Sequence, residues 1–275
     1  MSLTPIDKAL EQLVPLLPLI TEQENVPLEQ AVRRVLADDC VSPIDVPPHR
    51  NSAMDGYALK STDLGSENIQ LKITQRIAAG EVGQKLSSGE AARIFTGAPV
   101  PEGADAVVMQ ENCKVSGDVL SVQQQHVPSG ENLRQAGDDI QAGDLILAKG
   151  HRLKPQDIGL LASIGLESVS VTRRLRVSLL TTGDELVQPG TKLEAGQIYN
   201  SNYFTLHALL KGLQVEVLDC GIVADDFEET RRALISAAAT SDCIITTGGV
   251  SAVSYTHLRA HETPEHLVCR LLLEK

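Results

Sequence analysis

Two similar stretches decide the fold of this chain, LLTTGDEL at Leu179–Leu186 and IITTGGVS at Ile244–Ser251. In each, a short apolar run leads directly into Thr-Thr-Gly, which is typical of a buried strand that ends in a glycine turn. The residues between them follow a helix, strand and helix pattern. Strands that alternate with helices of this length predict βαβ units and a parallel sheet from Leu175 onward.

The paired Thr-Thr-Gly turns predict a ligand pocket. The carboxyl ends of parallel strands meet at one edge of a sheet, where open α/β sheets bind their ligands. Small hydroxyl and glycine residues there let backbone N–H groups approach an anion. Either turn alone is more simply a strand-to-helix connection, but the pair favours an oxyanion or phosphate pocket. Its candidate residues are Thr182, Gly183, Thr247, Gly248, Gly249 and Ser251.

Carboxylates stand beside this predicted pocket. Glu185 and Asp184 belong to the first turn, and Asp225 follows the second strand of the unit. A carboxylate next to a phosphate is repulsive unless a divalent cation lies between them, so the pattern suggests Mg²⁺, with Glu185 and Asp225 as candidate ligands. Capping of a helix N-terminus is the simpler alternative for Asp225 and an equal one for Asp184.

The residues before this unit have a different texture. A capping pattern begins at Thr4, and Pro15 and Pro18 are expected to end the helix that follows early. Further helices are predicted over Leu28–Ala37 and Lys154–Gly165. Between them, short alternating apolar runs separated by glycine turns predict a small β domain.

Three polar segments of this β domain are candidate site loops. They are Pro47–Leu59 (PPHRNSAMDGYAL), Arg93–Val107 (RIFTGAPVPEGADAV) and Glu131–Ile140 (ENLRQAGDDI). Loops that concentrate polar and charged groups often carry function. For the first, a plain polar turn is an equally good interpretation. In the third, Arg134 and Asp139 could form an anion clamp, although a solvated turn is favoured there.

Composition restricts the function classes. The chain has 275 residues, 24 Lys and Arg against 36 Asp and Glu, and a net charge of −12. This charge, with 3% aromatic residues and no Trp, excludes a basic nucleic-acid binder. The five cysteines form no CxxC pair, no signal peptide is apparent and no apolar run spans a membrane, which together predict a cytoplasmic protein.

Six motifs in order resemble one family. The three polar segments, RVSLLTTGDEL, GQIYNSN (Gly196–Asn202) and CIITTGGVS are similar to those of the molybdopterin molybdenumtransferases, the molybdenum insertases to which the gephyrin C-terminal domain also belongs. The resemblance covers residues 1–251. It implies a multidomain protein of mixed α/β and α+β class. The implied parts are a discontinuous elongated domain (1–45 plus 146–174), an inserted β domain (46–145) and an incomplete parallel α/β molybdopterin-binding domain (175–251).

The resemblance also implies a reaction. Such proteins bind adenylylated molybdopterin and molybdate, cleave the adenylate with Mg²⁺ and insert molybdenum, releasing AMP, and they work as homodimers. The residues it assigns to catalysis are Asp55, Thr96, Asp139, Glu185 and Asp225. Those it assigns to ligand binding are Arg134, Thr182, Gly183, Thr247, Gly248, Gly249 and Ser251. A non-catalytic molybdopterin-binding scaffold and a molybdopterin adenylyltransferase are the alternatives.

The last residues, 252–275, depart from the family pattern. They contain three of the seven histidines, and Pro264 stands where a helix is due. We expect this tail to be unrelated to the fold, to replace the genuine C-terminal part, and to leave the chain with little or no turnover. His257 and His261 stand four apart and could share one face of a helix. HETPEH (His261–His266) is not the HExxH zinc motif, because its histidines are five apart and Pro264 breaks the helix, so a metal site there is not favoured.

Overall fold

The computed structural model describes residues 5–65, 70–123 and 126–248. The chain divides into two compact units, residues 26–169 and residues 1–25 with 170–275. β1 (Gln23–Pro27) pairs with β12 (Ser168–Thr172) in a two-stranded sheet, and each of these strands contains residues of both units.

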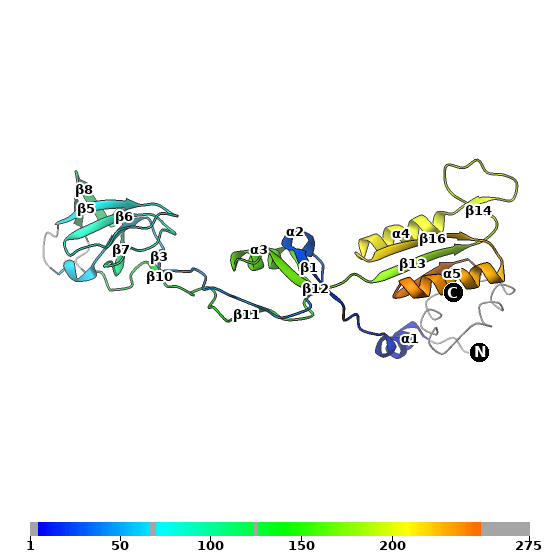
Figure 1. The fold of residues 1–275 in the computed structure, drawn as a ribbon. Coiled ribbons are helices and arrows are strands. Elements are labelled where there is room, and N and C mark those ends of the chain that lie inside the picture. Colours follow the sequence, from blue (N-terminus) through cyan, green and yellow to red (C-terminus); the bar gives the residue numbers. More distant parts are fainter. Residues whose placement is uncertain (1–4, 66–69, 124–125, 249–275) are drawn as a thin grey trace. The chain divides into compact units, whose positions relative to one another are not determined.

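The unit of residues 26–169 is built on a six-stranded sheet, of order β7-β4-β6-β5-β9-β8 (Figure 1). Its strands are β4 (Gly56–Leu59), β5 (Gln70–Ile77), β6 (Glu90–Ile94), β7 (Ala106–Met109), β8 (Cys113–Ser116) and β9 (Val119–Val122). β5 and β6 run parallel, and the other neighbours run antiparallel. Ala58 and Leu59 belong to two different buried clusters because successive side chains of a strand point to opposite faces. The short alternating apolar runs of this part of the chain therefore form strands of one sheet.

Shorter elements surround this sheet. β2 (Cys40–Val41) pairs with β11 (Leu145–Leu147), and β3 (Asn51–Ser52) pairs with β10 (Leu133–Arg134). The helices of the unit are α2 (Leu28–Ala31), α3 (Pro155–Ser163), and the single 3₁₀ turns η2 (Ser61–Asp63) and η3 (Gln110–Asn112). α3 is followed by Gly165 at φ 85°, the left-handed conformation predicted for a glycine after a helix.

The helix predicted over Leu28–Ala37 is wrong beyond its first turn. α2 ends at Ala31, and Arg33 adopts a φ of 66°, which no helix allows. The N–H groups of Arg33 and Leu36 donate instead to the carbonyls of Leu153 and His151. Tertiary pairing therefore replaces the helical bonds, although Leu36 is buried as the apolar pattern required.

The N-terminal helix follows its proline pattern. α1 spans Ile6–Leu13, and a single 3₁₀ turn, η1 (Val14–Leu16), follows it. The helix ends before Pro15, as predicted, because a proline has no N–H to donate and crowds the preceding turn. Thr4, the predicted capping residue, lies outside the described residues, and Pro5 occupies the position before the helix.

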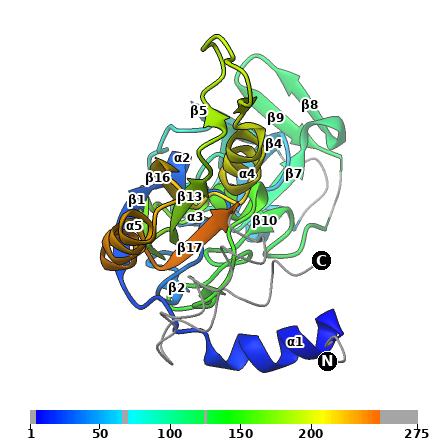
Figure 2. The same cartoon turned by 90° about the vertical axis from the view of Figure 1, so that its right-hand side faces the viewer.

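The second unit contains the predicted parallel sheet. β13 (Arg176–Thr182), β16 (Glu216–Val223) and β17 (Cys243–Thr247) run parallel in the order β16-β13-β17. α4 (Ser201–Gly212) and α5 (Phe227–Thr240) cover opposite faces of it (Figure 2). A short parallel pair, β14 (Leu186–Val187) and β15 (Ile198–Tyr199), follows β13.

This strand order locates the binding edge of the sheet. The chain leaves β13 for the neighbour on one side, β16, and then crosses to the neighbour on the other side, β17. Such a reversal is a topological switch point, and ligands bind in the crevice outside the carboxyl ends of the two diverging strands. The switch point here lies between the ends of β13 and β17, where the two Thr-Thr-Gly turns stand.

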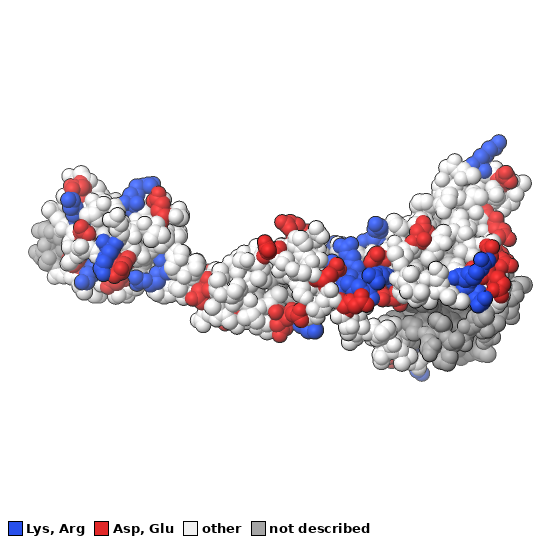
Figure 3. Space-filling view, in the orientation of Figure 1, with Lys and Arg blue, Asp and Glu red and all other residues white. Residues whose placement is uncertain are grey.

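The surface carries charged residues of both signs. Acidic and basic side chains are interspersed on the face that Figure 3 shows. Arg173 illustrates the pairing: it donates to Asp242 at 2.6 and 2.7 Å and to Glu22 at 2.5 Å. The bonds from Arg173 to Asp242 hold the pKa of Asp242 below its usual range. Among the described residues, no helix has the length and apolarity needed to cross a membrane.

Candidate functional site

The first group of predicted site residues lies in the β-sheet unit. Asp55 stands just before β4 and Thr96 just after the end of β6. Asp55 Oδ1 accepts two hydrogen bonds from Thr96, one from its N–H and one from its hydroxyl, both at 2.8 Å. The backbone bond, followed by the hydroxyl bond, lowers the pKa of Asp55, so this carboxylate is ionised at neutral pH.

Arg93 ties these two residues to the sheet. It lies on β6, and its guanidinium donates to the carbonyl of Gly56 at 2.8 Å and to Gln110 Oε1 at 2.5 Å. The same group lies 4.5 Å from the ring centroid of Phe95 and 5.2 Å from that of Tyr57. Phe95 immediately precedes Thr96, so Arg93 fixes the backbone on both sides of the Asp55–Thr96 pair.

The third polar segment lies beside the first. β10 pairs with β3, which places Arg134 opposite Asn51. Arg134 forms an ion pair with Asp139, and both side chains are about half exposed. The structure therefore brings together Asp55 with Thr96 and Arg134 with Asp139. Each charged group already has a partner there, and the roles that the resemblance assigns to these residues stay predictions.

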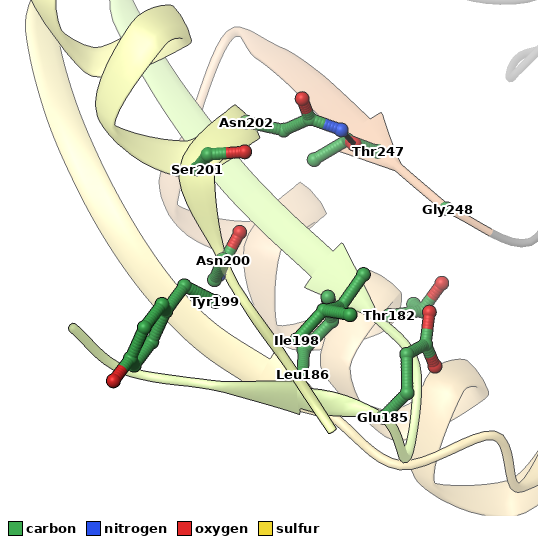
Figure 4. A pocket seen from close by; sticks show the side chains of 10 residues that line it. All are labelled: Thr182, Glu185, Leu186, Ile198, Tyr199, Asn200, Ser201, Asn202, Thr247 and Gly248. Carbon is green, nitrogen blue, oxygen red and sulfur yellow. Dashed lines mark hydrogen bonds between the residues drawn. The ribbon is translucent and has the colours of Figure 1, made fainter. Parts of the chain in front are cut away.

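The second group surrounds a cavity at the switch point of the α/β unit. The cavity has a volume of about 130 Å³ (Figure 4). Its walls come from the end of β13, the β14–β15 pair, the start of α4 and the end of β17. The residues that line it are Thr182, Glu185, Leu186, Ile198, Tyr199, Asn200, Ser201, Asn202, Thr247 and Gly248.

Thr182 and Gly248 form the closest approach of the two turns. A Cβ on Gly248 would lie 2.3 Å from the carbonyl oxygen of Thr182 and 2.7 Å from its hydroxyl, and Gly248 has a φ of 99°. Only glycine fits this position. The buried hydroxyl of Thr182 has no hydrogen-bond partner in the described part of the chain. A buried polar atom without a partner is costly, so it points to a group that the cavity receives.

The neighbouring Thr181 has a structural role. Its hydroxyl donates to the carbonyl of Gly221 at 3.1 Å and accepts from Asn200 Nδ2 at 2.9 Å. Asn200 is buried, and its Oδ1 accepts from the N–H of Tyr203, which caps α4. Asn202, two residues after Asn200 and in the first turn of α4, donates to the hydroxyl of Thr247 at 3.2 Å. The start of α4 is thereby fixed to the ends of β13 and β17.

The predicted carboxylates occupy different positions. Glu185 lines the cavity, and its carboxylate lies over Gly183, where a Cβ would come within 2.5 Å of Oε2. Asp184 accepts from the N–H of Asp225 at 3.1 Å and joins two loops. Asp225 is exposed and is not among the residues lining the cavity, while Asp226 caps α5 by accepting from the N–H of Glu229.

The donor set suits Mg²⁺ only with help from a ligand. Within residues 5–65, 70–123 and 126–248, no three His, Cys, Asp or Glu side chains gather in a way that could hold a metal ion. Mg²⁺ is commonly held by one or two carboxylates together with substrate phosphates. Glu185 could supply one carboxylate, and the participation of Asp225 stays a prediction.

Two predicted residues, Gly249 and Ser251, lie outside the described residues, as does the tail 252–275. Sequence reasoning missed the wall formed by Leu186, Ile198 and Tyr199. The one feature of the sequence that could have indicated it is the pair of apolar residues directly before Asn200. A strand of two residues is too short to show the alternating pattern by which strands are recognised.

Two known protein families match this chain, one in its N-terminal part and one in its C-terminal part. Residues 4–165 match the family described as MoeA N-terminal region (domain I and II), and residues 178–260 match the one described as probable molybdopterin binding domain. The second match runs beyond Ser251, into the predicted tail.

Curated relatives match most of the chain. The molybdopterin molybdenumtransferase of Haemophilus influenzae is 41% identical over 247 residues, which are 90% of this chain and 61% of the relative. Molybdopterin molybdenumtransferase 2 of Mycobacterium tuberculosis is 39% identical over 236 residues, 84% of this chain and 58% of the relative. The chain thus spans about three fifths of these relatives.

A solved structure has the same fold. The molybdopterin biosynthesis MoeA protein from Pyrococcus horikosii superposes with a TM-score of 0.80 at 32% identity, covering 94% of this chain and 67% of that one. The fold class predicted from the sequence is therefore confirmed. Since the match to the MoeA N-terminal region alone spans residues 4–165, more than half of the chain, the chain belongs to the MoeA family of molybdopterin molybdenumtransferases.

Proposed function

We propose that the protein to which this sequence belongs transfers molybdenum from molybdate to adenylylated molybdopterin and releases AMP. One observation carries the proposal: a cavity at the switch point, within the region similar to a molybdopterin-binding domain, is lined by Glu185 and by Thr182, whose buried hydroxyl has no hydrogen-bond partner among the described residues. The names of the curated relatives support it over an adenylyltransferase.

The residues of the cavity suggest how a phosphate-bearing ligand is held. The Thr182 hydroxyl can donate to a phosphate oxygen, and Gly248 leaves room for that oxygen to approach the backbone. Glu185 would hold Mg²⁺ together with the phosphate oxygens, and the ion would supply charge neutralisation at the phosphoanhydride. Thr96 orients the ionised carboxylate of Asp55, so Asp55 is suited to accept a hydrogen bond from a ligand.

Substrate retention and turnover test this proposal separately. The chain is incubated with adenylylated molybdopterin, with and without molybdate and Mg²⁺, and bound ligand and free AMP are measured. We expect retention that Thr182→Val weakens. In a protein extended to the full length of the relatives, we expect AMP release that requires both additions and that Glu185→Ala abolishes. Retention without any AMP release from the extended protein would favour the scaffold alternative, and no retention would contradict the proposal.

The remaining expectations belong to the same proposal. We propose a cytoplasmic homodimer. Sedimentation of the extended protein would show a dimer if this is correct and a monomer if it is wrong.

A further inference from the structure

The protein holds only one oxygen of the Asp55 carboxylate. Oδ1 accepts both hydrogen bonds from Thr96, while Oδ2 accepts none from the described residues. The side chain of Asp55 is partly exposed. Oδ2 is therefore the oxygen with which this carboxylate can accept a further hydrogen bond, as long as Asp55 and Thr96 keep their relative position.

Arg93 holds the backbone on the Asp55 side of this pair. Its guanidinium donates directly to the carbonyl of Gly56 at 2.8 Å and to Gln110 Oε1 at 2.5 Å. The N–H of Gln110 in turn donates to the carbonyl of Asp55 at 3.1 Å. One guanidinium thus fixes the two carbonyls that follow the Cα of Asp55, the first through Gln110 and the second directly.

The same guanidinium also holds the Thr96 side. It packs over the ring of Phe95, 4.5 Å from the ring centroid, and Phe95 is the residue directly before Thr96. A planar guanidinium can stack on a ring and donate several hydrogen bonds in its own plane, which a lysine ammonium cannot do. The contacts of Arg93 therefore span both partners of the carboxylate bond.

A second arginine stacks on this ring without those bonds. Arg76 on β5 lies opposite Arg93 in the register of the parallel pair β5 and β6, and its guanidinium is also 4.5 Å from the Phe95 centroid. Within the described residues, the side chain of Arg76 has no hydrogen bond or ion pair. The two arginines share charge and stacking, and the bonds to Gly56 and Gln110 distinguish Arg93.

We propose that Arg93 is a positioning residue that keeps Asp55 Oδ1 on Thr96 and so leaves Oδ2 to the ligand. It does this without contacting the ligand. The inference rests on the proposed function, in which Asp55 accepts a hydrogen bond from a ligand. The two bonds from Thr96, and to a smaller extent the charge of Arg93, lower the pKa of Asp55, so the positioned carboxylate is also the ionised one.

The first test is NMR of the whole chain and needs no substrate. In the unmodified protein, the two Nη groups of Arg93 should give separate signals because their bonds hinder rotation, and those of Arg76 should be averaged. Arg93→Gln should speed hydrogen exchange at the Thr96 N–H by about tenfold, the order of effect of weakening one bond to a charged group. Arg93→Lys keeps the charge but not the planar fork and should act similarly. Arg76→Gln, the matched control, should change the exchange by less than about threefold.

The second test is AMP release by the protein extended to the full length of the relatives. We expect Arg93→Gln to lower kcat/KM by about tenfold or more, because a small displacement of a positioned group is costly, and Arg76→Gln to lower it by less than about threefold. Asp55→Asn completes a double-mutant cycle. If Arg93 acts through Asp55, Arg93→Gln should cause little further loss in the Asp55→Asn protein.

The contrary outcomes separate this role from the proposed function. Averaged Nη signals for Arg93, or a Thr96 exchange rate that Arg93→Gln changes no more than Arg76→Gln does, would overturn the positioning role. Equal losses of kcat/KM from Arg93→Gln with and without Asp55→Asn would overturn it too, since Arg93 would then support only the fold. No AMP release from the unmodified extended protein would contradict the proposed function, and the NMR test would still show whether Arg93 holds the pair.

Discussion

The two groups of site residues differ in how their polar atoms are satisfied. In the β-sheet unit, Asp55 accepts two hydrogen bonds from Thr96, and Arg134 pairs with Asp139. In the α/β unit, the hydroxyl of Thr182 and the carboxylate of Glu185 have no side-chain partner among the described residues, and both border a cavity. The first group is held in position by its own contacts. The second has a buried hydroxyl that no described residue satisfies and a carboxylate beside a cavity, which is the arrangement expected of a ligand site.

The largest expected effect is at the glycine that lets the two turns of the α/β unit meet. Gly248→Ala would place a Cβ 2.3 Å from the Thr182 carbonyl at a φ of 99°. Because the carbonyl belongs to the backbone, it cannot move aside cheaply, and we expect a loss of about 3 kcal/mol in the stability of this unit. Hydrogen exchange at the amides of β13 measures it.

A matched glycine in the other unit provides the control. Gly97 has a φ of 81°, but a Cβ added there would meet no other atom within 4 Å. Gly97→Ala therefore meets only the conformational penalty of about 1 kcal/mol. Equal losses at the two glycines would show that the contact between the turns of the α/β unit is not tight.

The next effect concerns the pH dependence of the Asp55–Thr96 pair. The folded pKa of Asp55 is depressed, chiefly by the Thr96 N–H. The stabilisation from this pair is therefore present above the ordinary carboxyl pKa of about 3.9 and disappears as the pH falls through the lower folded value. Thr96→Val removes the hydroxyl bond and keeps the N–H bond, so the pKa of Asp55 should rise part of the way back.

Carbon-detected NMR titration of the Asp55 carboxyl measures this shift directly. Thr62→Val is a matched control, because Thr62 belongs to the same unit and no hydrogen bond joins it to Asp55. A pKa of Asp55 that Thr96→Val leaves unchanged would mean that the hydroxyl does not hold the carboxylate.

The smallest effect is expected at Arg134. Its pair with Asp139 is about half exposed on both sides, so solvent and salt screen the attraction. Arg134→Ala should reduce the stability of the β-sheet unit by less than about 1 kcal/mol, and the loss should shrink further at high salt. Urea unfolding at two ionic strengths measures it. A larger, salt-independent loss would show that Arg134 has packing contacts that matter more than its charge.

The sequence predicted the parts of this molecule whose pattern is local. The apolar run before the first Thr-Thr-Gly turn correctly placed β13, and the helix, strand and helix pattern after it correctly placed α4 and α5 between the strands. The end of α2 could not be predicted, because the bonds that replace its helix come from residues more than a hundred positions away, at His151 and Leu153.

In the candidate site too, local patterns could be predicted from the sequence and contacts between distant residues could not. Thr182, Glu185, Thr247 and Gly248 were predicted because two similar turns at parallel strand ends must meet, and all four line the cavity. The wall at Ile198 depends on the pairing of β14 with β15 across a long loop, which no periodicity reveals. The bond from Thr96 to Asp55 joins residues 41 positions apart. Only the resemblance to a family linked those two beforehand.

The most direct test of the difference between the two groups is Thr182→Val, measured for stability and for AMP binding on the same protein. If the hydroxyl serves a ligand, the unfolding free energy of the α/β unit should change by less than about 1 kcal/mol, because the hydroxyl has no hydrogen bond to a described residue that could be lost. The affinity for AMP should fall about tenfold, which corresponds to about 1.4 kcal/mol. A clear loss of stability with unchanged AMP affinity would contradict the account, because the hydroxyl would then hold the fold and not the ligand.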